Sequence, residues 1–163
     1  MTHIRKAVPS EAEILTRIAH DAKRYWGYPE NWIEHWKEQL TITPEFIGEN
    51  EVYLAISEDQ VAGFYAIVEV GPRNADDSSP GKAELEHMWV KPEHIGTGIG
   101  KELLIHAIET ATFLDAAALE ISSDPNAEGF YKRMGAKRIG EITSEIEGQP
   151  RTLPHLSIDL TSQ

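Results

Sequence analysis

The 163-residue sequence contains no cysteine. This absence excludes disulfide bonds, zinc–thiolate sites and cysteine nucleophiles, and it favours a protein of the reducing cytoplasm. No stretch approaches the ~20 consecutive apolar residues that a membrane-spanning helix needs, so we expect no membrane partner. The residues after Met1 contain no apolar run, and we expect no secretory signal peptide. The prediction is a cytoplasmic location.

Positive charge is also scarce, because 15 Lys and Arg stand against 27 Asp and Glu and the formal net charge is −12. Binding to nucleic acid rests on neutralising phosphates with basic side chains, so we expect no nucleic-acid partner. The histidines are scattered without the spacing of metal ligands, and we predict no metal site. The length and the ordinary apolar and charged fractions favour one globular domain over residues 1–163.

Apolar periodicity and turn residues divide the chain into alternating strands and helices. A capping box of Ser10 and Glu13 is expected to start the first helix, and a second helix is expected over 30–40, with one further turn at 43–47. Residues 71–82 are rich in Pro, Asn, Asp, Ser and Gly and predict a surface loop. Strands are predicted over 4–8, 52–56, 61–68, 83–90, 116–122, 137–145 and 153–160, the last two joined through 148–150. The element order predicts a mixed α/β or α+β sheet.

The most informative stretch runs from Leu85 to Leu104 and is typical of a strand, a short turn, a glycine-rich loop and the start of a helix. Successive backbone N–H groups at such a loop, with a helix N-terminus behind them, form an anion site. The loop is not a dinucleotide fingerprint, because Lys101 stands where the third glycine would be needed. It is not a P-loop either, because Ile95 and Glu102 replace its required glycine and its Ser or Thr.

Two motifs carry a family resemblance. The run from Val90 to Leu104, with Pro92 and the Gly96-Thr97-Gly98-Ile99-Gly100 core, resembles the acetyl-CoA signature of the GCN5-related N-acetyltransferase (GNAT) superfamily. The run from Asp124 to Ala136 resembles a later motif of the same superfamily. The resemblance implies a central, mostly antiparallel, twisted sheet of about seven strands flanked by about four helices, and a homodimer. Two positions depart from the family pattern, since Ile95 replaces Arg or Gln and Asp124 replaces Asn.

The resemblance also implies the reaction, which is direct transfer of an acetyl group from acetyl-CoA to a primary amine of a small molecule or peptide. Two alternatives are a non-catalytic acetyl-CoA sensor of the same fold and a transferase that uses another acyl-CoA. The implied acetyl-CoA-binding residues are Met88, Trp89, Val90, Ile95, Gly96, Thr97, Gly98, Ile99, Gly100, Lys101, Asn126 and Tyr131. Among them, Val90 is the candidate N–H donor to the thioester oxygen.

The candidate catalytic side chains are Tyr131 and residues of the strand that precedes the loop. Tyr131 matches the family tyrosine that protonates the leaving thiolate. A base must take the proton of the amine, and Glu86 is favoured over His87 and Glu84. Regular alternation places Glu84, Glu86 and Met88 on one face and Leu85, His87 and Trp89 on the other, unless a bulge shifts the parity.

Aromatic residues concentrate between the first two predicted helices, where the family resemblance places the wall of the acceptor pocket. The candidate substrate-binding residues are Tyr25, Trp26, Tyr28 and Trp32. Such a group could form a cage for a cationic amine through cation–π attraction. The same residues could equally form a small core under the helices or a dimer contact.

Overall fold

The computed structural model describes residues 2–70 and 81–161. Its strands form one seven-stranded sheet in the order β1-β2-β3-β4-β5-β7-β6. Neighbouring strands are antiparallel except β4 and β5, which are parallel. The expectation of a mostly antiparallel sheet of about seven strands is confirmed. The strands are β1 (Thr2–Lys6), β2 (Glu51–Ser57), β3 (Gln60–Val70), β4 (Lys82–Val90), β5 (Ala118–Ser122), β6 (Lys137–Ile146) and β7 (Gln149–Asp159).

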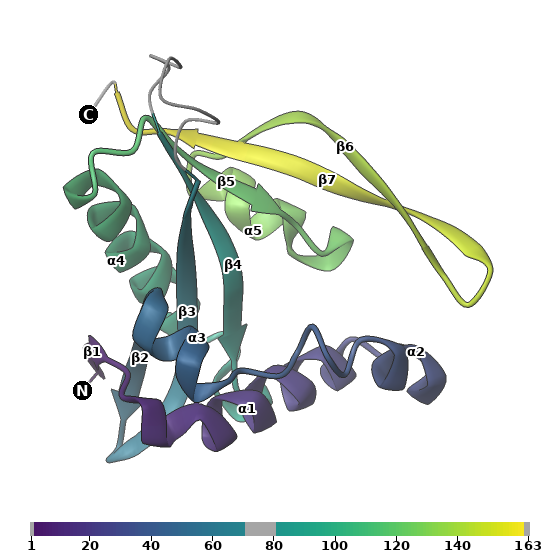
Figure 1. The fold of residues 1–163 in the computed structure, drawn as a ribbon, viewed down its shortest axis with the longest axis horizontal. Helices are drawn as coiled ribbons and strands as arrows, with labels where there is room; N and C mark the ends of the chain where they lie inside the picture. The colour runs from purple at the N-terminus through teal and green to yellow at the C-terminus, as the bar shows by residue number, and fades with distance from the viewer. Residues whose placement is uncertain (1, 71–80, 162–163) are drawn as a thin grey trace.

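The helices cover both faces of the sheet. Helix α4 lies along β3 and β4 on one face, and α1 packs on the other (Figure 1). Among the described residues, no helix has the length and apolar character to cross a bilayer. The helices are α1 (Ala12–Tyr25), α2 (Glu30–His35), α3 (Pro44–Glu49), α4 (Ile99–Phe113) and α5 (Glu128–Arg133), with 3₁₀ turns η1 (Pro9–Glu11), η2 (Pro92–His94) and η3 (Pro125–Ala127).

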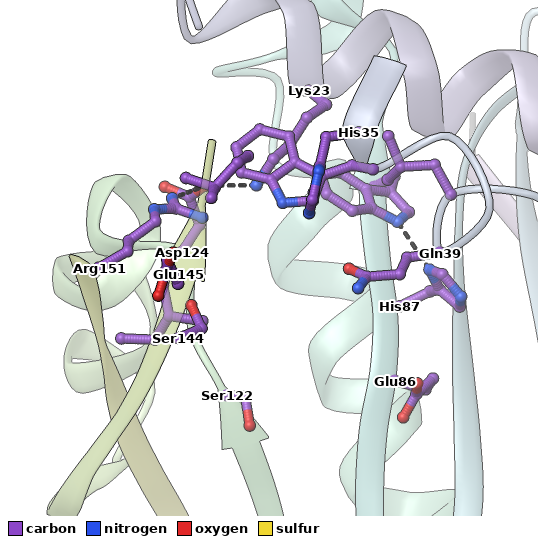
Figure 2. Close-up of a pocket in the computed structure, with 15 residues that line it drawn as sticks. Lys23, His35, Gln39, Glu86, His87, Ser122, Asp124, Ser144, Glu145 and Arg151 are labelled. Carbon is purple, nitrogen blue, oxygen red and sulfur yellow. Dashed lines mark hydrogen bonds and ion pairs between the residues drawn. The ribbon is translucent and has the colours of Figure 1, made fainter. Parts of the chain in front are cut away.

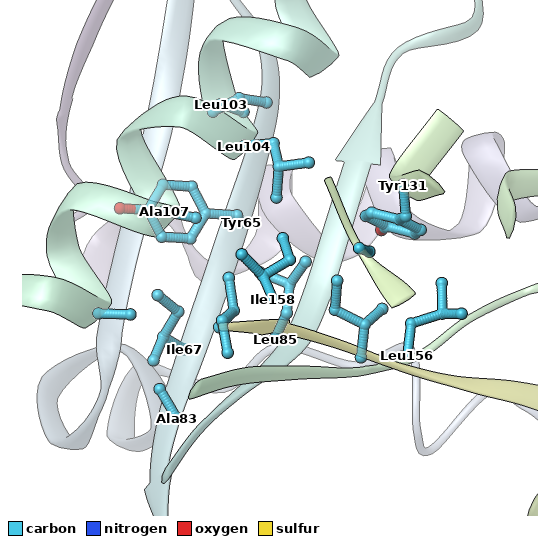
Figure 3. Packing of buried hydrophobic residues seen from close by; sticks show 14 of the residues in the cluster. Tyr65, Ile67, Ala83, Leu85, Leu103, Leu104, Ala107, Tyr131, Leu156 and Ile158 are labelled. Atoms are coloured by element: carbon cyan, nitrogen blue, oxygen red, sulfur yellow. The ribbon is translucent and has the colours of Figure 1, made fainter. Parts of the chain in front are cut away.

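Two apolar cores follow from the period of two along the strands. Tyr65 and Phe64 are neighbours in β3 and are both fully buried, but they lie in different cores. Tyr65 packs in the α4 core with Leu104 and Ile158 (Figure 3). Phe64 packs in the α1 core with Leu15. Full burial of a leucine such as Leu104 contributes about 1.5–3 kcal/mol, so these cores hold both helix layers on the sheet.

The N-terminal segment differs from the prediction in two details. The expected capping box of Ser10 and Glu13 is wrong, because Ser10 lies inside η1 and α1 begins at Ala12. Glu11 does the capping instead, since its Oε1 accepts the N–H of Val8 at 2.9 Å. The Glu11 carboxylate also pairs with Arg5 of β1 at 2.7 Å, which lowers the pKa of Glu11. This ion pair ties the start of the helix to the sheet.

The second predicted helix is shorter than expected, because α2 ends at His35 and residues 36–40 form turns. The further turn expected at 43–47 is the short helix α3, whose N-cap Thr43 accepts the N–H of Phe46 at 3.0 Å. The last hairpin turns at Glu147 and Gly148, which both have positive φ. Gly148 lies in the connection as predicted, but Gln149 and Pro150 are wrongly included, because they pair with Ile146 and Glu145. The predicted loop at 71–82 lies mostly outside the described residues.

The parallel pair β4 and β5 creates the opening on which the site is built. The two strands pair only at Ala83 with Leu119 and at Glu84 with Glu120. Beyond these positions they diverge, and β5 leads into η3 and α5 while β4 leads into the glycine loop (Figure 1). Everything between Leu85 and Val90 therefore has β3 on one side and an open edge on the other.

Candidate functional site

A groove of about 540 Å³ fills the opening between β4 and β5. Its walls come from β4, the glycine loop, the end of β5, η3 and α5. The groove contains most of the residues predicted to bind the cofactor, and it omits Thr97 and Ile99. The lining residues are Ala22, Trp26, Leu85, Glu86, Met88, Trp89, Val90, His94, Ile95, Gly96, Gly98, Gly100, Lys101, Ile121, Ser122, Ser123, Asp124, Asn126, Ala127, Gly129, Phe130, Tyr131 and Arg133.

The glycine loop offers a defined set of backbone donors to this groove. The N–H groups of Ile95 and Thr97 are used within the loop, by the carbonyls of Pro92 and His94. The first intrahelical bond of α4 runs from Glu102 to Gly98. Among the described residues, the N–H groups of Gly96 and of 98–101 therefore have no backbone partner. Convergent free donors at a helix N-terminus are the arrangement that binds phosphate.

Glycine is required at two positions of this loop. Gly96 has a φ of 84° and Gly98 a φ of 90°, values that a side chain with a Cβ rarely adopts. The space where a Cβ would lie is open at both positions, so a ligand can approach the backbone. The adjacent Ile95 side chain is 41% exposed and lies at the rim of the groove. The residues present therefore fit the pyrophosphate of a coenzyme A molecule.

The open edge of β4 directs backbone donors into the same groove. The N–H of Lys91 donates to the carbonyl of Ala62 at 2.8 Å, toward β3. Because successive residues of a strand direct their N–H groups to opposite edges, the N–H of Val90 points toward β5. Val90 lines the groove beside Met88. This edge can pair with an extended, amide-containing ligand as an added strand would.

A β-bulge in β4 determines which side chains share a face. Ala66 of β3 pairs with His87 and the next residue, Ile67, pairs with Leu85, so Glu86 has no partner on β3. Leu85 lies in the α4 core, where Met88 also packs, whereas Trp89 packs against the α1 core. The alternation predicted from sequence, which placed Leu85 on the face of His87 and Trp89, is therefore wrong. The sequence prediction held only for a strand without a bulge, and the bulge at Glu86 shifts which residues share a face.

Glu86 occupies the bulge and lines both the groove and a second cavity. Partial burial raises the pKa of its carboxyl, and the neighbouring Glu84 raises it further. A carboxylate with a raised pKa is a stronger proton acceptor than an ordinary glutamate. Glu84 itself lines neither cavity.

His87 is held in one tautomer by its neighbour on the same face. The indole Nε1–H of Trp89 donates to Nδ1 of His87 at 3.0 Å, so the ring proton of the neutral histidine lies on Nε2. Burial lowers the pKa of His87 to about 4. At neutral pH the side chain is then an uncharged donor, with no ring nitrogen free to accept a proton.

Tyr131 lies at the inner wall of the groove, on α5, and is 6% exposed (Figure 3). Burial raises the pKa of its hydroxyl, and the Asp124 carboxylate adds to this effect. No hydrogen-bond partner of this hydroxyl exists among the described residues, and no fully buried side-chain oxygen there lacks one. The hydroxyl is therefore a protonated donor that is accessible from the groove.

The second cavity, of about 420 Å³, lies on the other side of Glu86 and shares Glu86, Trp89, Ser122 and Asp124 with the groove. We call it the acceptor cavity. Figure 2 shows Arg151 and Asp124 on one side of it and Glu86 and His87 of β4 on the other. The lining residues are Lys23, His35, Trp36, Gln39, Leu40, Glu86, His87, Trp89, Ser122, Asp124, Ser144, Glu145, Ile146, Arg151 and Leu153.

A buried polar network fills one end of the acceptor cavity. Asp124 pairs with Lys23 Nζ at 2.9 Å and accepts the Tyr28 hydroxyl at 3.0 Å. Arg151 donates to the Tyr28 oxygen at 2.7 Å, and Asn126 donates to Asp124 at 2.9 Å. Burial lowers the pKa of Lys23 although Asp124 opposes this, and Lys23 together with these hydrogen bonds keeps the pKa of Asp124 below its usual value despite burial.

The network explains the Asp124 departure from the family pattern. An asparagine would offer no charge to Lys23, whose side chain is only 10% exposed. Asp124 also accepts the backbone N–H of Asn126 at 2.9 Å, and so it caps η3. No motif singles out Lys23 or Arg151, because they lie on α1 and β7, far from Asp124 in the chain.

The aromatic residues predicted to bind substrate are divided by the structure. Trp26 lines the groove and Tyr25 is 51% exposed. Tyr28 and Trp32 stack with ring centroids 5.9 Å apart, and burial raises the pKa of Tyr28 to about 12. Trp36 lines the acceptor cavity.

A loop with free N–H donors, a groove along an open strand edge and an adjoining polar cavity fit an enzyme that brings a phosphate-bearing cosubstrate to a second substrate. Comparison with known proteins identifies the family. The model of the Acetyltransferase (GNAT) family matches residues 15–136, and the chain belongs to this family. It is an acetyltransferase, and acetyl-CoA is the cosubstrate of the family. Among the described residues, no group of His, Asp and Glu side chains could hold a metal ion.

Two curated relatives share one name, peptidyl-lysine N-acetyltransferase YjaB. The relative from Salmonella typhimurium is 31% identical over 133 residues, which cover 78% of this chain and 89% of that protein. The relative from Escherichia coli is 26% identical over 125 residues, which cover 76% of this chain and 75% of that protein. These relatives and the family model confirm the expectation of an N-acetyltransferase.

Solved structures share the fold at lower identity. A GCN5-related N-acetyltransferase from Rhodopseudomonas palustris has a TM-score of 0.79 at 17% identity, covering 98% of this chain and 96% of that one. The PaiA N-acetyltransferase from Thermoplasma acidophilum, solved in complex with coenzyme A, has a TM-score of 0.73 at 20% identity, covering 98% and 99%. The expected fold class is confirmed.

Proposed function

We propose that this protein, as a single domain over residues 1–163, transfers the acetyl group of acetyl-CoA to the ε-amine of lysine in a peptide or protein. The names of the two curated relatives support this acceptor. The observation that carries the proposal is the position of Glu86, which lines both the groove and the acceptor cavity. A base at this junction can reach an amine that enters from one side and an acyl group held on the other.

In the proposed complex, the free N–H groups of Gly96 and of 98–101 bind the pyrophosphate, and the β4 edge at Met88 and Val90 holds the extended arm. The bound cosubstrate supplies an activated acetyl thioester. The N–H of Val90 stabilises the negative charge that develops on the thioester oxygen. Ile95 lines the groove but contributes no N–H donor, because its N–H is bonded to the carbonyl of Pro92, and Asn126 is held on Asp124 at the groove wall.

Glu86 is the proposed base, and its raised pKa suits the task. An ordinary lysine amine, of pKa ~10.4, is protonated at neutral pH and must lose a proton before it can attack. His87 is a poor candidate, because its Nδ1 accepts the Trp89 indole and its Nε2 carries the ring proton. His87 instead offers a neutral hydrogen-bond donor to the acceptor cavity.

Tyr131 is the proposed donor to the leaving thiolate. Because its pKa is raised, its hydroxyl stays protonated throughout the physiological range. Full proton transfer to a free thiolate, of pKa ~8.5, would be uphill from such a tyrosine. We therefore assign Tyr131 a short hydrogen bond that stabilises the thiolate as the bond to carbon breaks.

The family resemblance is the basis for a further part of the proposal, a homodimer in solution, and the lack of cysteine is the basis for a cytoplasmic location. The net charge of −12 is the basis for expecting no nucleic-acid partner.

The test is release of free thiol from acetyl-CoA in the presence of Nα-acetyl-lysinamide. The Glu86→Gln variant is expected to lower the rate by about 100-fold or more, as loss of a general base does. The shift of the melting temperature by acetyl-CoA should stay unchanged. Glu84→Gln is the matched control, since it removes the same charge from a side chain that lines neither cavity. It should change the rate far less, because it removes only the smaller of the two causes that raise the pKa of Glu86. A wild-type rate in Glu86→Gln would show that Glu86 is not the base.

A further inference from the structure

The acceptor cavity contains more buried positive charge than its buried carboxylate balances. The side chains of Lys23 and Arg151 are 10% and 13% exposed, and they share Asp124, which is 11% exposed. Lys23 lies at 2.9 Å from the Asp124 carboxylate, whereas Arg151 lies at 3.6 Å and donates to neutral Tyr28 instead. The buried side chains at this end therefore have a net positive charge, and the other two carboxylates that line the cavity, Glu86 and Glu145, are exposed.

Arg151 has donors to spare. A guanidinium carries five N–H donors in a planar fork that matches a carboxylate. Its Nη2 bonds Tyr28, and among the described residues Nε and Nη1 have no hydrogen-bond partner. No fully buried side-chain nitrogen of the described residues lacks a partner, so these two nitrogens are accessible from the cavity that Arg151 lines.

The aromatic groups that could hold a cationic amine are already occupied by the protein itself. Lys23 Nζ lies 4.1 Å from the ring centroid of Trp36 and 4.9 Å from that of Tyr28. The Arg151 guanidinium lies 4.9 Å from the Trp36 centroid, on the same cluster. A cationic group of the acceptor would meet two fixed cations here. Of the two exposed carboxylates in the cavity, Glu145 lies on the side of Arg151, whereas Glu86 lies on the opposite side and also lines the groove, so the amine that is acetylated faces Glu86 (Figure 2).

We propose that the acceptor carries a carboxylate close to the amine that is acetylated, and that Arg151, supported by Lys23, binds this carboxylate. The inference rests on the proposed function, because it describes the acceptor of that same reaction. Amine and carboxylate would then face Glu86 and Arg151 respectively. The carboxylate has two possible sources, which are the α-carboxylate of a free or C-terminal lysine and an acidic side chain beside the lysine in a peptide.

The experiment compares two pairs of acceptors that differ only in a carboxylate. One pair is Nα-acetyl-lysine and Nα-acetyl-lysinamide, and the other is the end-blocked dipeptides aspartyl-lysine and asparaginyl-lysine. Thiol release gives kcat/KM for each with the wild type, Arg151→Gln and the control Arg138→Gln, which removes an arginine from the neighbouring strand β6. At least one carboxylate acceptor should be preferred by about tenfold or more, a free-energy difference of 1.4 kcal/mol. The pair that shows the preference identifies the source.

In Arg151→Gln, the ratio of kcat/KM for the carboxylate acceptor to kcat/KM for its neutral counterpart should fall close to one. In Arg138→Gln this ratio should stay unchanged. Arg151→Lys, which keeps the charge but loses the fork, should retain part of it. Equal rates within both pairs, or a preference that survives Arg151→Gln, would overturn the inference while turnover itself supports the proposed function. If the wild type acetylates none of the four compounds, the inference and the proposed lysine acceptor both fail. The wild-type comparison needs no variant, so an unstable Arg151→Gln protein cannot obscure the result.

Discussion

Replacing Asp124 by asparagine, the residue usual in the family motif, should destabilise this protein. Asp124 is the one carboxylate that contacts Lys23 among the described residues, at 2.9 Å, and both side chains are about nine-tenths buried. Asparagine keeps the shape but leaves the Lys23 ammonium buried without a counter-charge. Removing one partner of a buried ion pair costs about 3–5 kcal/mol. For a protein of this size, ~3 kcal/mol lowers Tm by roughly 6–12 °C.

Removing Lys23 should cost less than removing Asp124. In Lys23→Met the Asp124 carboxylate keeps the Tyr28 hydroxyl at 3.0 Å, the N–H of Asn126 at 2.9 Å and Arg151 nearby. The methionine fills the space of the lysine stem, so we expect a loss of about 1 kcal/mol, close to that of one hydrogen bond. The double variant should be more stable than Asp124→Asn alone, because it no longer buries an unpaired ammonium.

The pH dependence gives a second readout with a definite sign. Burial lowers the pKa of Lys23 in the folded protein. At pH values between this lowered pKa and ~10.4, the pKa of an ordinary lysine, the unfolded chain binds more protons than the folded protein. In this range the free energy of unfolding therefore rises with pH. The deficit of Asp124→Asn should therefore shrink toward pH 10. The pKa of Asp124 is lowered instead, so its contribution is present above ~3.9 and is lost as pH falls further. Asp124→Asn should lack this acid-sensitive component.

The assay is urea unfolding followed by tryptophan fluorescence, because Trp36 and Trp89 lie against Lys23. Each variant is measured at pH 7 and pH 10. An m value equal to that of the wild type checks that unfolding remains two-state. Two results would refute the reasoning. One is an Asp124→Asn protein within ~0.5 kcal/mol of wild type, the range of ordinary surface substitutions. The other is a Lys23→Met protein that loses as much stability as Asp124→Asn.

Three further predictions concern the groove. Tyr131→Phe should lower kcat by about 10–100-fold, because losing a hydrogen bond to a charged group costs about 1.5–3 kcal/mol, with unchanged coenzyme binding by calorimetry; an unchanged kcat across pH would remove Tyr131 from the mechanism. Gly98→Val should abolish the thermal shift by acetyl-CoA, because φ is 90° there and the side chain would fill the open space; normal affinity would contradict the phosphate site. Trp89→Phe should raise the pKa of His87 above about 4, measured by NMR, because the indole stabilises the neutral ring; a constant pKa would refute the tautomer assignment.

The parts of the fold that sequence predicts best are those with local causes. The loop from Gly96 to Gly100, the helix behind it and the η3 cap at Asp124 each follow from residues within a few positions of one another. Gly135 ends α5 with a φ of 103°, as expected of a C-terminal glycine. The mostly antiparallel pairing of the strands follows less directly, because the family resemblance rather than periodicity predicts it.

The errors arise where two local signals compete or where one residue is inserted. Glu11 and Glu13 could each cap the first helix, and the contact with Arg5 of β1, which is tertiary, favours Glu11. The predicted face of Leu85 was wrong, because a bulge at Glu86 inverts the alternation of side chains along β4. An alternating pattern with a period of two contains no signal for the position of a bulge. Glu86, at the bulge, also lines both the groove and the cavity, so the irregular position is the one that we propose as the base.

The acceptor cavity could not be predicted, because its charges come from three distant elements. Lys23 is on α1, Asp124 precedes η3 and Arg151 is on β7, and they meet only once the sheet has formed. From sequence, the net charge of −12 is compatible with a cationic substrate. A ligand in the cavity, however, interacts more strongly with the buried Arg151 guanidinium, which lies 3.6 Å from Asp124, than with distant charges on the surface. Salt screens those surface charges beyond about 10 Å. The buried charges of a cavity in an acidic protein can therefore be net positive, and Asp124 is the counter-charge that allows Lys23 to be buried there.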